Sequence, residues 1–437
     1  MKIFCNLQLR GFAYFLTLRL IFTNLLNVKI ARLLLAGAFV FAEPLEGLLC
    51  ASEAPIPAAE KAGTIELTRN QIADHIRGGW TGMLIGGIEG LAHEFKYIQE
   101  PRPELPEYPF LPQGARTDDD NDFEWTHLFF MDKEDVIKIP YPRLVEIWKA
   151  NMNTGLWCAN QQARKLMDQG FVPPETANPT RNSFAPYNLA GQFCTESYGM
   201  IAPGMPQTAA EIGLHYARVS VSGEPLQAAQ YWPALISMVA VSDRSLEELM
   251  RDCLAGVDPR SAQAEAVQEA IKLFHQHPTD WKAARQFFHE KWYCPKERPW
   301  NPNAQPLKWN DNSTPLNGAM VILALLYGGG DFYKTGQYAM ALGYDADCNA
   351  ATACAVVGTR IGFSAIERLP QYHMPDHYLN LTRPQLPKEC KVSEQAAVML
   401  RLGEKLILAN GGQRLSSNGE VRYRVRLQTP RLLQPLP

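Results

Sequence analysis

The sequence predicts an all-α fold built as a single large helical domain. Most segments from residue 68 onward place apolar residues three and four positions apart, which is the spacing of helices with one buried face. The alternation of apolar and polar residues that marks a strand is scarce before residue 420. With 437 residues, of which 46% are hydrophobic, the chain is long enough to bury a sizeable core.

The first fifty residues differ in character from the rest of the chain. An apolar run is followed by Lys29, Arg32, a second apolar run and the small residue Ala42. A basic segment, a short apolar segment and a small residue at a cleavage point are typical of a signal peptide. We therefore expect residues 1–51 to be a hydrophobic leader that directs export to the periplasm or the extracellular space. A linker over 52–67 is expected to follow it.

Two other interpretations of this leader stay open. One is an uncleaved membrane anchor, and the other is a wrongly assigned start codon. With export, the true start is expected near Val28. Stable membrane insertion is not expected once the leader is removed, because the sequence has no uninterrupted span of about 20 apolar residues. Without export, the protein would be cytoplasmic.

The main domain is expected over residues 68–410. It opens with a helix whose glycines indicate close packing against another helix or close approach to a ligand. These glycines stand at positions 78, 79, 82, 86, 87 and 90. Two loops, 101–112 and 293–315, hold five prolines each. The apolar segment that ends in the glycines 328–330 predicts a buried helix.

Six further segments between the two loops carry helical spacing, and they cover residues 141–152, 157–170, 208–221, 224–241, 245–256 and 261–277. The tail over 411–437 contains the one convincing strand pattern, "GEVRYRVRLQTP".

Charge and cysteine usage exclude several classes of protein. The net charge is -3, from 42 basic and 45 acidic side chains, and long basic runs are absent, so a nucleic-acid partner is not expected. The nine cysteines are scattered and form no C-x-x-C pair. They therefore predict neither a disulfide framework nor a zinc site of the common spacing.

Two stretches, "TDDDNDFEWTH" and "GYDADCNAATACAVVGTRIG", crowd carboxylates at the start of a predicted helix. A helix cap needs one acid, whereas residues 118–122 hold four. Buried carboxylates without a partner are costly, and a cation would offset their charge. Oxygen-rich clusters suit Mg²⁺, Ca²⁺ or Mn²⁺. The alternative is a solvated acidic turn that favours the positive end of the helix.

The order of these motifs resembles the ADP-ribosylglycohydrolase family, in its dinitrogenase reductase-activating glycohydrolase-like branch. The resemblance covers about Ile72 to Gly362, and it also includes "NLAGQFCTESYGMIAPGMPQ" and "LNGAMVILALLYGGGDFYKT". It implies one all-α domain whose cleft holds two Mg²⁺ ions, with Mn²⁺ as a possible substitute. It also implies a glycosidic hydrolase.

The resemblance also implies a set of metal ligands. The family's first turn reads Thr-Asp-Asp-Thr, and its first three residues bind metal. In this chain it fits in two registers, so the candidates are Thr117, Asp118, Asp119 and Asp120. The second turn supplies Asp345 and Asp347, and Cys348 stands where the family has a Thr ligand. A thiol is a soft ligand and a poor partner for Mg²⁺, so this position departs from the family pattern.

Catalytic and substrate-binding roles follow from the same resemblance. Asp119 and Asp345 are candidates to take a proton from the attacking water. Glu94 follows Gly86 and Gly90 as in the family, although Gly87 replaces an Asp, and it is expected to hold the substrate or to act as an acid or base. Without the resemblance, the sequence predicts only that Glu94 lies on the surface of a helix.

Two more side chains are candidates for substrate binding. Glu196 is expected to line the cleft, and Trp309, like Trp300 in the same loop, to stack on an adenine or a sugar. The alternative for the tryptophans is that they pin the loop to the body of the domain.

Three hypotheses for function remain. The first is a Mg²⁺-dependent hydrolase that cleaves an N- or O-glycosidic bond of ADP-ribose, in a small molecule or in an ADP-ribosylated protein. The second is an exported glycoside hydrolase acting on a nucleoside or a furanoside. The third is a non-catalytic, metal-binding or structural member of the same fold. Fold alone does not decide between them.

Overall fold

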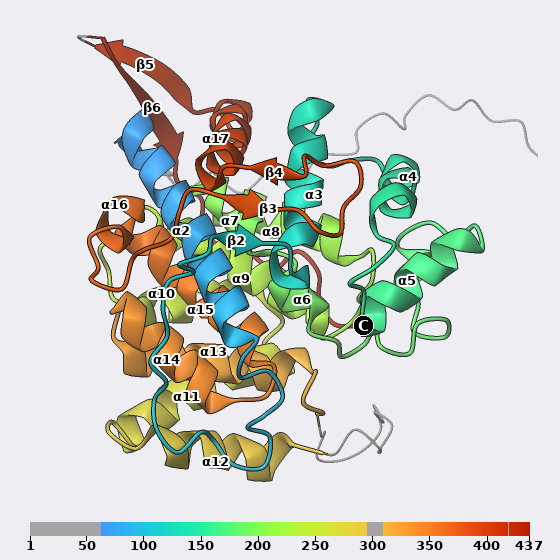
Figure 1. Ribbon diagram of the computed structural model, residues 1–437, viewed down its shortest axis with the longest axis vertical. Helices are drawn as coiled ribbons and strands as arrows, with labels where there is room; N and C mark the ends of the chain where they lie inside the picture. Colours follow the sequence, from blue (N-terminus) through green and yellow to red (C-terminus); the bar gives the residue numbers. More distant parts are fainter. Residues whose placement is uncertain (1–62, 295–308, 418) are drawn as a thin grey trace, which may run out of the picture. The chain divides into compact units, whose positions relative to one another are not determined.

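Helices make up most of the computed structural model, which describes residues 63–294, 309–417 and 419–437 (Figure 1). The leader predicted over 1–51 and most of the predicted linker lie outside the described residues. Among the described helices, none combines the length and the apolar composition that a bilayer crossing needs. In chain order the α-helices are α2 (Arg69–Gly90), α3 (Asp119–Lys133), α4 (Tyr141–Asn151), α5 (Cys158–Asp168), α6 (Ala190–Phe193), α7 (Glu196–Met200), α8 (Pro206–Ala217), α9 (Pro225–Val239), α10 (Leu246–Asp252), α11 (Ala262–Gln276), α12 (Trp281–Trp292), α13 (Thr314–Gly328), α14 (Phe332–Leu342), α15 (Ala346–Ile361), α16 (Phe363–Ile366) and α17 (Val392–Ala409).

The helices expected between the two proline-rich loops are confirmed as α4, α5, α8, α9, α10 and α11. Two 3₁₀ helices, η1 (Glu175–Ala177) and η2 (Cys253–Gly256), accompany them. Residues 101–112 contain no helix and only an isolated bridge from Phe110 to Tyr372, as their prolines predict. The described residues from 63 onward form one compact unit, and the prediction of a single helical domain is confirmed.

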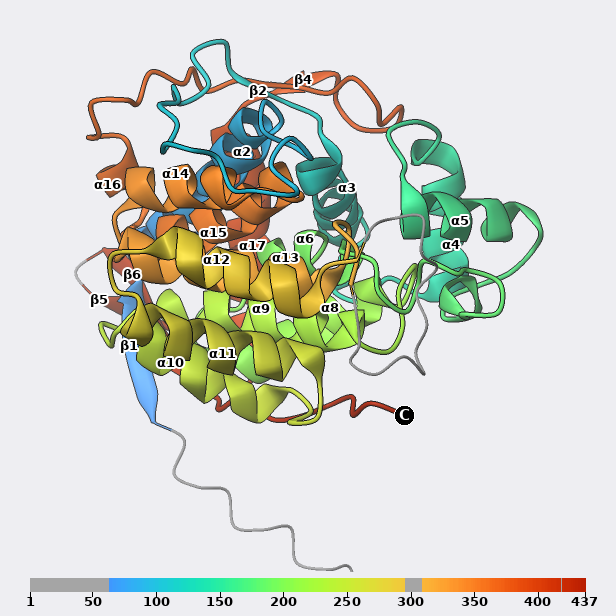
Figure 2. The same cartoon turned by 90° about the horizontal axis from the view of Figure 1, so that it is seen from below.

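The apolar helix α13 lies at the centre of the helical layers. It packs against α11, α12, α14 and α15, and Figure 2 shows these neighbours around it. Nearly all of its residues are buried, which is why its sequence is apolar on every face. It ends at Gly329, whose φ of 60° is the left-handed conformation that glycine adopts most readily. The predicted buried helix is therefore confirmed.

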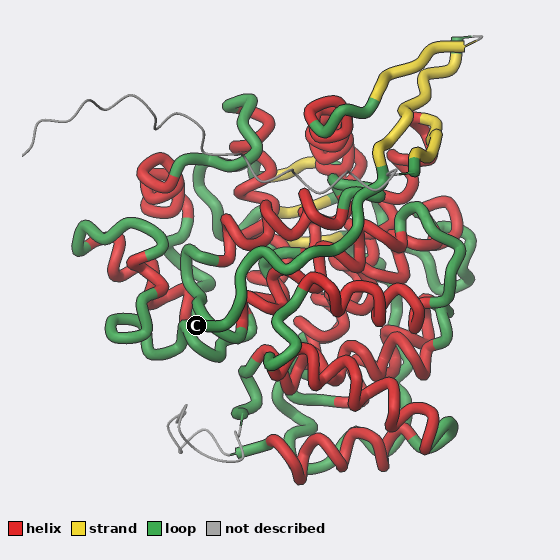
Figure 3. The backbone as a smooth tube through the Cα atoms, turned by 180° about the vertical axis from the view of Figure 1, so that it is seen from behind, coloured by secondary structure: helices red, strands yellow, loops and turns green. Residues whose placement is uncertain are grey.

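Strands are a minor part of the fold (Figure 3). One antiparallel sheet has the order β1 (Thr64–Thr68), β6 (Glu420–Arg426), β5 (Gln413–Ser417), and Leu67 stands opposite Tyr423. A second, smaller sheet has the order β2 (Ala115–Arg116), β3 (Tyr378–Leu379), β4 (Glu389–Cys390). The sequence analysis placed residues 64–67 in the linker, and they form β1. Its pairing partner lies at the other end of the chain, where a local pattern does not reveal it.

Glycines on one face of α2 bring its backbone against α15. Gly78, Gly82, Gly86 and Gly90 are four residues apart and therefore share a face. A Cβ added to Gly86 would lie 2.1 Å from the carbonyl oxygen of Ala350, and one added to Gly90 would lie 2.4 Å from the Cα of Asp347. Only glycine fits there, as the sequence analysis expected. The glycine face places the end of α2 beside the first turn of α15, where the second acidic cluster begins.

We expect Gly86→Ala to destabilise the protein by about 2 kcal/mol or more, because the new methyl group overlaps backbone atoms that cannot move alone. In an unhindered helix the same change would stabilise by up to about 1 kcal/mol. Gly256→Ala is the matched control, since its Cβ would meet its nearest neighbour, in Pro430, at an ordinary 3.4 Å. Urea unfolding of both variants measures the effect. Equal costs for the two changes would contradict the packing argument.

Candidate metal centre

The first acidic turn begins α3 and is fixed by the small sheet. The N–H of Thr117 donates to the carbonyl oxygen of Leu379 (3.0 Å), and the Thr117 hydroxyl oxygen accepts the N–H of Leu381 (3.0 Å). Asp118 caps the helix by position, but its side chain makes no capping hydrogen bond. If Asp118 served only as a helix cap, its side chain would accept a hydrogen bond from the first turn of α3, and it does not. The Thr117 hydroxyl oxygen keeps a second lone pair, so this hydrogen bond leaves both registers of the first turn open.

The second acidic turn begins α15. Gly343 and Tyr344, with φ of 84° and 61°, turn the chain into the helix through the left-handed region. Asp345 is the N-cap residue, and its side chain makes no capping hydrogen bond either. Its Oδ2 instead accepts a hydrogen bond from the Asn312 amide (2.9 Å), and its N–H donates to Asn317 Oδ1 (3.2 Å). Asn312 thus orients the Asp345 carboxylate, and Asn317 holds the backbone from which it projects.

Glu94 lies in the turn that follows α2, and this turn is tied to the second acidic turn. The N–H of Phe95 donates to the carbonyl oxygen of Tyr344 (2.8 Å). The buried guanidinium of Arg285 donates to the carbonyl oxygen of Tyr97 (3.1 Å). These bonds hold Glu94 near the start of α15, in agreement with the glycine face that brings α2 there.

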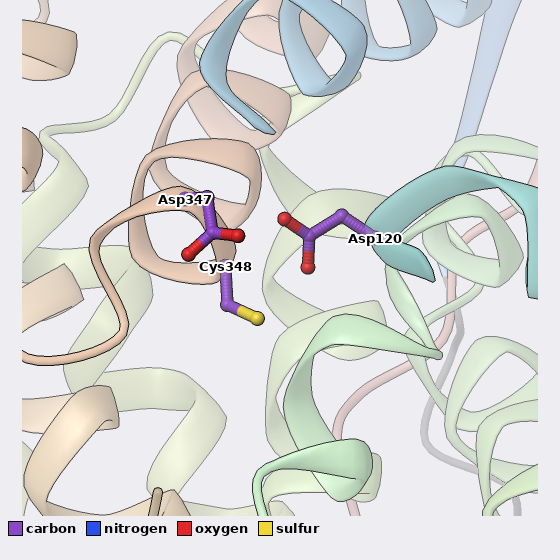
Figure 4. A group of neighbouring side chains, drawn as sticks. All are labelled: Asp120, Asp347 and Cys348. Carbon is purple, nitrogen blue, oxygen red and sulfur yellow. The ribbon is translucent and has the colours of Figure 1, made fainter. Parts of the chain in front are cut away.

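Two groups of side chains stand close enough together to hold cations. Glu94, Asp345 and Asp347 form the first group, and Asp120, Asp347 and Cys348 form the second. Within each group, one ligand atom from every residue lies within 4.8 Å of the others. Figure 4 shows Asp347 and Cys348 on the first turn of α15 facing the carboxylate of Asp120 on α3. The structure thus brings the two acidic turns together, although they are more than two hundred residues apart in the sequence.

Several of these carboxylate oxygens are buried without a hydrogen-bond partner. They are both oxygens of Asp120, Oδ2 of Asp118 and Oδ1 of Asp347. Asp120 is only 1% exposed and Asp347 3% exposed. An unpaired buried carboxylate oxygen is costly, and native structures rarely leave one without a partner or an ion. The residues present therefore fit divalent cations.

The electrostatics of the cluster lead to the same conclusion. Burial, followed by the charge of Asp122, raises the pKa of Asp118 to about 6. Burial and neighbouring carboxylates raise the pKa of Asp119, Asp120 and Asp347 well above the usual range. Each acid thus makes ionisation of the others harder in the absence of a counter-charge. Bound cations would reverse these shifts.

A cavity of about 450 Å³ opens beside the cluster. Part of its lining is acidic and includes Glu94, Asp119, Asp345, Asp347 and Cys348. Another part is aromatic and is formed by Phe95, Trp157, Phe184, Tyr187 and Phe193. Asparagines 160, 188, 310 and 312 add amide groups. A cavity with apolar walls and a few convergent polar groups is the usual form of a small-molecule site.

Comparison with known proteins places the chain in a family. The family model described as ADP-ribosylglycohydrolase matches residues 68–397, from the cap of α2 into α17 and across both acidic turns. The chain belongs to the ADP-ribosylglycohydrolase family. A solved structure titled "ADP-ribosylglycohydrolase-related protein complex" is similar at 16% sequence identity, over 77% of this chain and 99% of that chain, with a TM-score of 0.45. No curated protein sequence matches the chain.

Membership in the ADP-ribosylglycohydrolase family confirms the resemblance drawn from the sequence and makes the chain a hydrolase at that coarse level. The family is typically metal-dependent, and the acidic groups fit that property.

Two residues that were expected to bind substrate lie away from the cavity. Glu196, at the start of α7, is fully buried, accepts hydrogen bonds from the Thr352 hydroxyl (2.5 Å) and the Thr195 N–H (3.1 Å), and is not part of the lining. Trp309 is 1% exposed, and its backbone forms an isolated β-bridge with Tyr293, which is half-buried. For Trp309 this matches the alternative of a loop pinned to the body. The proposed site therefore does not include either residue. Trp300 lies outside the described residues.

A buried ion pair that the sequence did not predict supports the first acidic turn. Arg383 contacts Asp122 of α3 at 2.6 Å, and both side chains are almost fully buried. Arg383 also donates to the carbonyl oxygen of Thr154 (2.7 Å), close ahead of Trp157 on the cavity wall. No local pattern reveals the pair, because its members are 261 residues apart.

Glu124 and Glu196 form a pair of interacting buried acids. The Ser197 N–H donates to Glu124 Oε1 (2.9 Å), and Glu124 Oε2 has no partner. Burial, followed by the charge of Glu196, raises the pKa of Glu124. Burial also raises the pKa of Glu196, to about 7.

Glu124→Gln is expected to make the protein less sensitive to rising pH. Carboxyls with a raised pKa stabilise the fold below their unfolded pKa, and this stability is lost as pH rises through the folded value. Between about pH 5 and pH 8 the wild type should therefore lose more stability than the variant, on the order of 1–3 kcal/mol. Urea unfolding at both pH values, with metal present, measures the difference. If the wild type and the variant lost the same stability between the two pH values, the two acids would not interact.

Proposed function

We infer that this protein is a hydrolase that depends on divalent cations and cleaves a glycosidic bond at the ribose of an ADP-ribosyl group. The observation that carries this proposal is the meeting of two acidic turns, with buried and unpartnered carboxylate oxygens, beside a cavity that aromatic side chains also line. Family membership supports the reaction class. The identity of the ions and of the substrate belongs to the proposal.

The residues that would hold cations are those of the two groups, together with Asp118 and Asp119 beside them. When bound, divalent cations supply Lewis acidity, which polarises substrate oxygens and makes water more acidic, and they offset the charge of the carboxylates. The group of Glu94, Asp345 and Asp347 offers only oxygens, which suits Mg²⁺ or Mn²⁺.

The side chains that line the cavity have separate roles in the proposed reaction. Asp119 and Asp345 both line it, so each can accept the proton of an attacking water. Glu94 lies on the same wall and is placed to hold a ribose hydroxyl or to give a proton to the leaving group. The aromatic side chains offer flat apolar surfaces that fit a nucleobase.

Release of ADP-ribose from peptides ADP-ribosylated on arginine or serine, measured by chromatography, tests the proposal. We expect release with Mg²⁺ or Mn²⁺, none after removal of metal with EDTA, and recovery on adding the ion back. Asp119→Asn should be inactive. Hydrolysis of nucleosides or furanosides alone would favour the second hypothesis. No hydrolysis of any of these compounds would favour the non-catalytic one.

Export remains part of the proposal, because it depends on residues 1–51, which lie outside the described residues. N-terminal sequencing of the protein purified from its natural source tests it. A start near Ala42 would support a cleaved leader, and a start at Met1 or near Val28 would contradict it.

A further inference from the structure

The two candidate cation positions differ in their donor atoms. They share Asp347, but one adds the oxygens of Glu94 and Asp345, whereas the other adds the oxygens of Asp120 and the sulfur of Cys348. Ligands of one cation, bound at about 2.0–2.3 Å, lie at most about twice that distance apart. The spacing within 4.8 Å in each group is close to that limit, so each group can close on an ion by a small movement.

The second position has the features of a built site. Figure 4 shows the sulfur of Cys348 and the carboxylate of Asp347, both on the first turn of α15, directed toward Asp120 on α3. Asp347 Oδ1 is buried and lacks a hydrogen-bond partner, and the buried Asp120 carboxylate has no partner other than the Cys348 thiol that it faces, so a cation would offset both charges. The Cys348 side chain is 5% exposed and lines the same cavity. The sulfur is therefore within reach of any ion that pairs these oxygens.

Sulfur and oxygen donors select different metals. Mg²⁺ demands oxygen ligands in near-octahedral geometry, and thiolates bind it poorly. Thiolates favour ions such as Zn²⁺, and a site with one sulfur and two carboxylates suits that class better than Mg²⁺. We propose that Asp120, Asp347 and Cys348 form a position for a thiophilic divalent cation of the Zn²⁺ type, beside an all-oxygen position for Mg²⁺ or Mn²⁺ at Glu94, Asp345 and Asp347.

This inference rests on the proposed function only for the expectation that the cavity holds two metal ions. In the inferred arrangement, a thiophilic cation takes the place of one of the two Mg²⁺ ions implied by the family resemblance. Binding converts the Cys348 thiol into a metal thiolate and releases one proton to solvent. The rival arrangement has both ions on oxygens, with the thiol beside them as a bystander.

Co²⁺ is the probe that separates the two arrangements, because a thiolate bound to it gives a charge-transfer band in the near ultraviolet and oxygen ligands do not. The full chain, reduced and freed of metal, is titrated with Co²⁺ without oxygen. The wild type should show the band. Cys348→Ser should lose it while keeping the weak visible bands of Co²⁺ on oxygens. Cys158→Ser is the matched control, because its thiol lines the same cavity, and it should keep the band.

Calorimetric titration with Zn²⁺ gives a second readout. Cys348→Ser should bind Zn²⁺ about 100-fold more weakly, while its affinity for Mg²⁺ is kept or increased, because a hydroxyl oxygen replaces the sulfur. Circular dichroism confirms that the variants are folded.

Three results would overturn the inference: no band in the wild type with Co²⁺ bound, a band that survives in Cys348→Ser, or a band lost in Cys158→Ser. None of these readouts needs a substrate. A thiolate band in a protein without hydrolase activity would uphold the site and refute the proposed function. Hydrolysis with Mg²⁺ and no thiolate band would do the reverse.

Discussion

Asp345→Asn is expected to abolish hydrolysis, to raise the melting temperature of the metal-free protein and to remove most of its stabilisation by Mg²⁺. Asp345 is 3% exposed and shares a cation group with Asp347 and Glu94. Two unit charges about 4 Å apart interact by about 4 kcal/mol at an effective dielectric of 20, so removal of one charge relieves the metal-free state. Asparagine keeps an oxygen for the Asn312 hydrogen bond. Melting curves with and without Mg²⁺, together with the activity assay, measure all three effects.

Asp118→Asn tests whether the first acidic turn serves the same centre. Asp118 is half-buried, its Oδ2 atom is buried without a hydrogen-bond partner, and the charge of Asp345 contributes to its raised pKa. The variant should also melt higher without metal and respond less to Mg²⁺. The double variant should be little less active than either single one, because losses within one site do not add. A full wild-type Mg²⁺ response in Asp118→Asn would show that this turn does not contribute to the centre.

Arg383→Met is expected to cost about 3–5 kcal/mol of stability, because it leaves the Asp122 carboxylate buried without its cation. It also removes the guanidinium from the face of the Phe123 ring and from the carbonyl oxygen of Thr154. Since Thr154 lies close ahead of Trp157, weaker substrate binding should accompany the loss of stability. Urea unfolding measures the first effect and KM the second.

Two further variants make the Arg383 result specific. Arg401→Met removes an exposed ion pair with Asp132 and should cost less than about 1 kcal/mol. Adding Asp122→Asn to Arg383→Met should recover part of the stability, because the unpaired charge is gone. If Arg383→Met cost no more than Arg401→Met, the buried pair would not support the acidic turn.

The sequence predicted the parts of this fold that local patterns encode. Helical spacing found the long helices, and the glycines of α2 predicted a close contact, which the structure identifies as α15. The sequence did not name that partner, because contact between distant segments has no local signature. The same reason explains why β1 was missed and why the Asp122–Arg383 pair left no trace in residue spacing.

The sequence predicted which residue types form the candidate site better than it predicted how they are arranged in space. The excess of carboxylates over what a cap needs identified both turns, and the structure brings them together. Trp309 and Glu196 were assigned from residue type, and type does not report depth in the core. The high density of asparagines around Asn312 could have identified part of the site, because Asn312 itself donates a hydrogen bond to the Asp345 carboxylate.

If the two acidic turns share one metal centre, anomalous diffraction from crystals soaked in Mn²⁺ will show it. We predict an anomalous peak between the first turns of α3 and α15, with at least one carboxylate of each turn within bonding distance of ions in the same cavity. No peak in the cavity, or ions bound by the carboxylates of a single turn, would contradict the account.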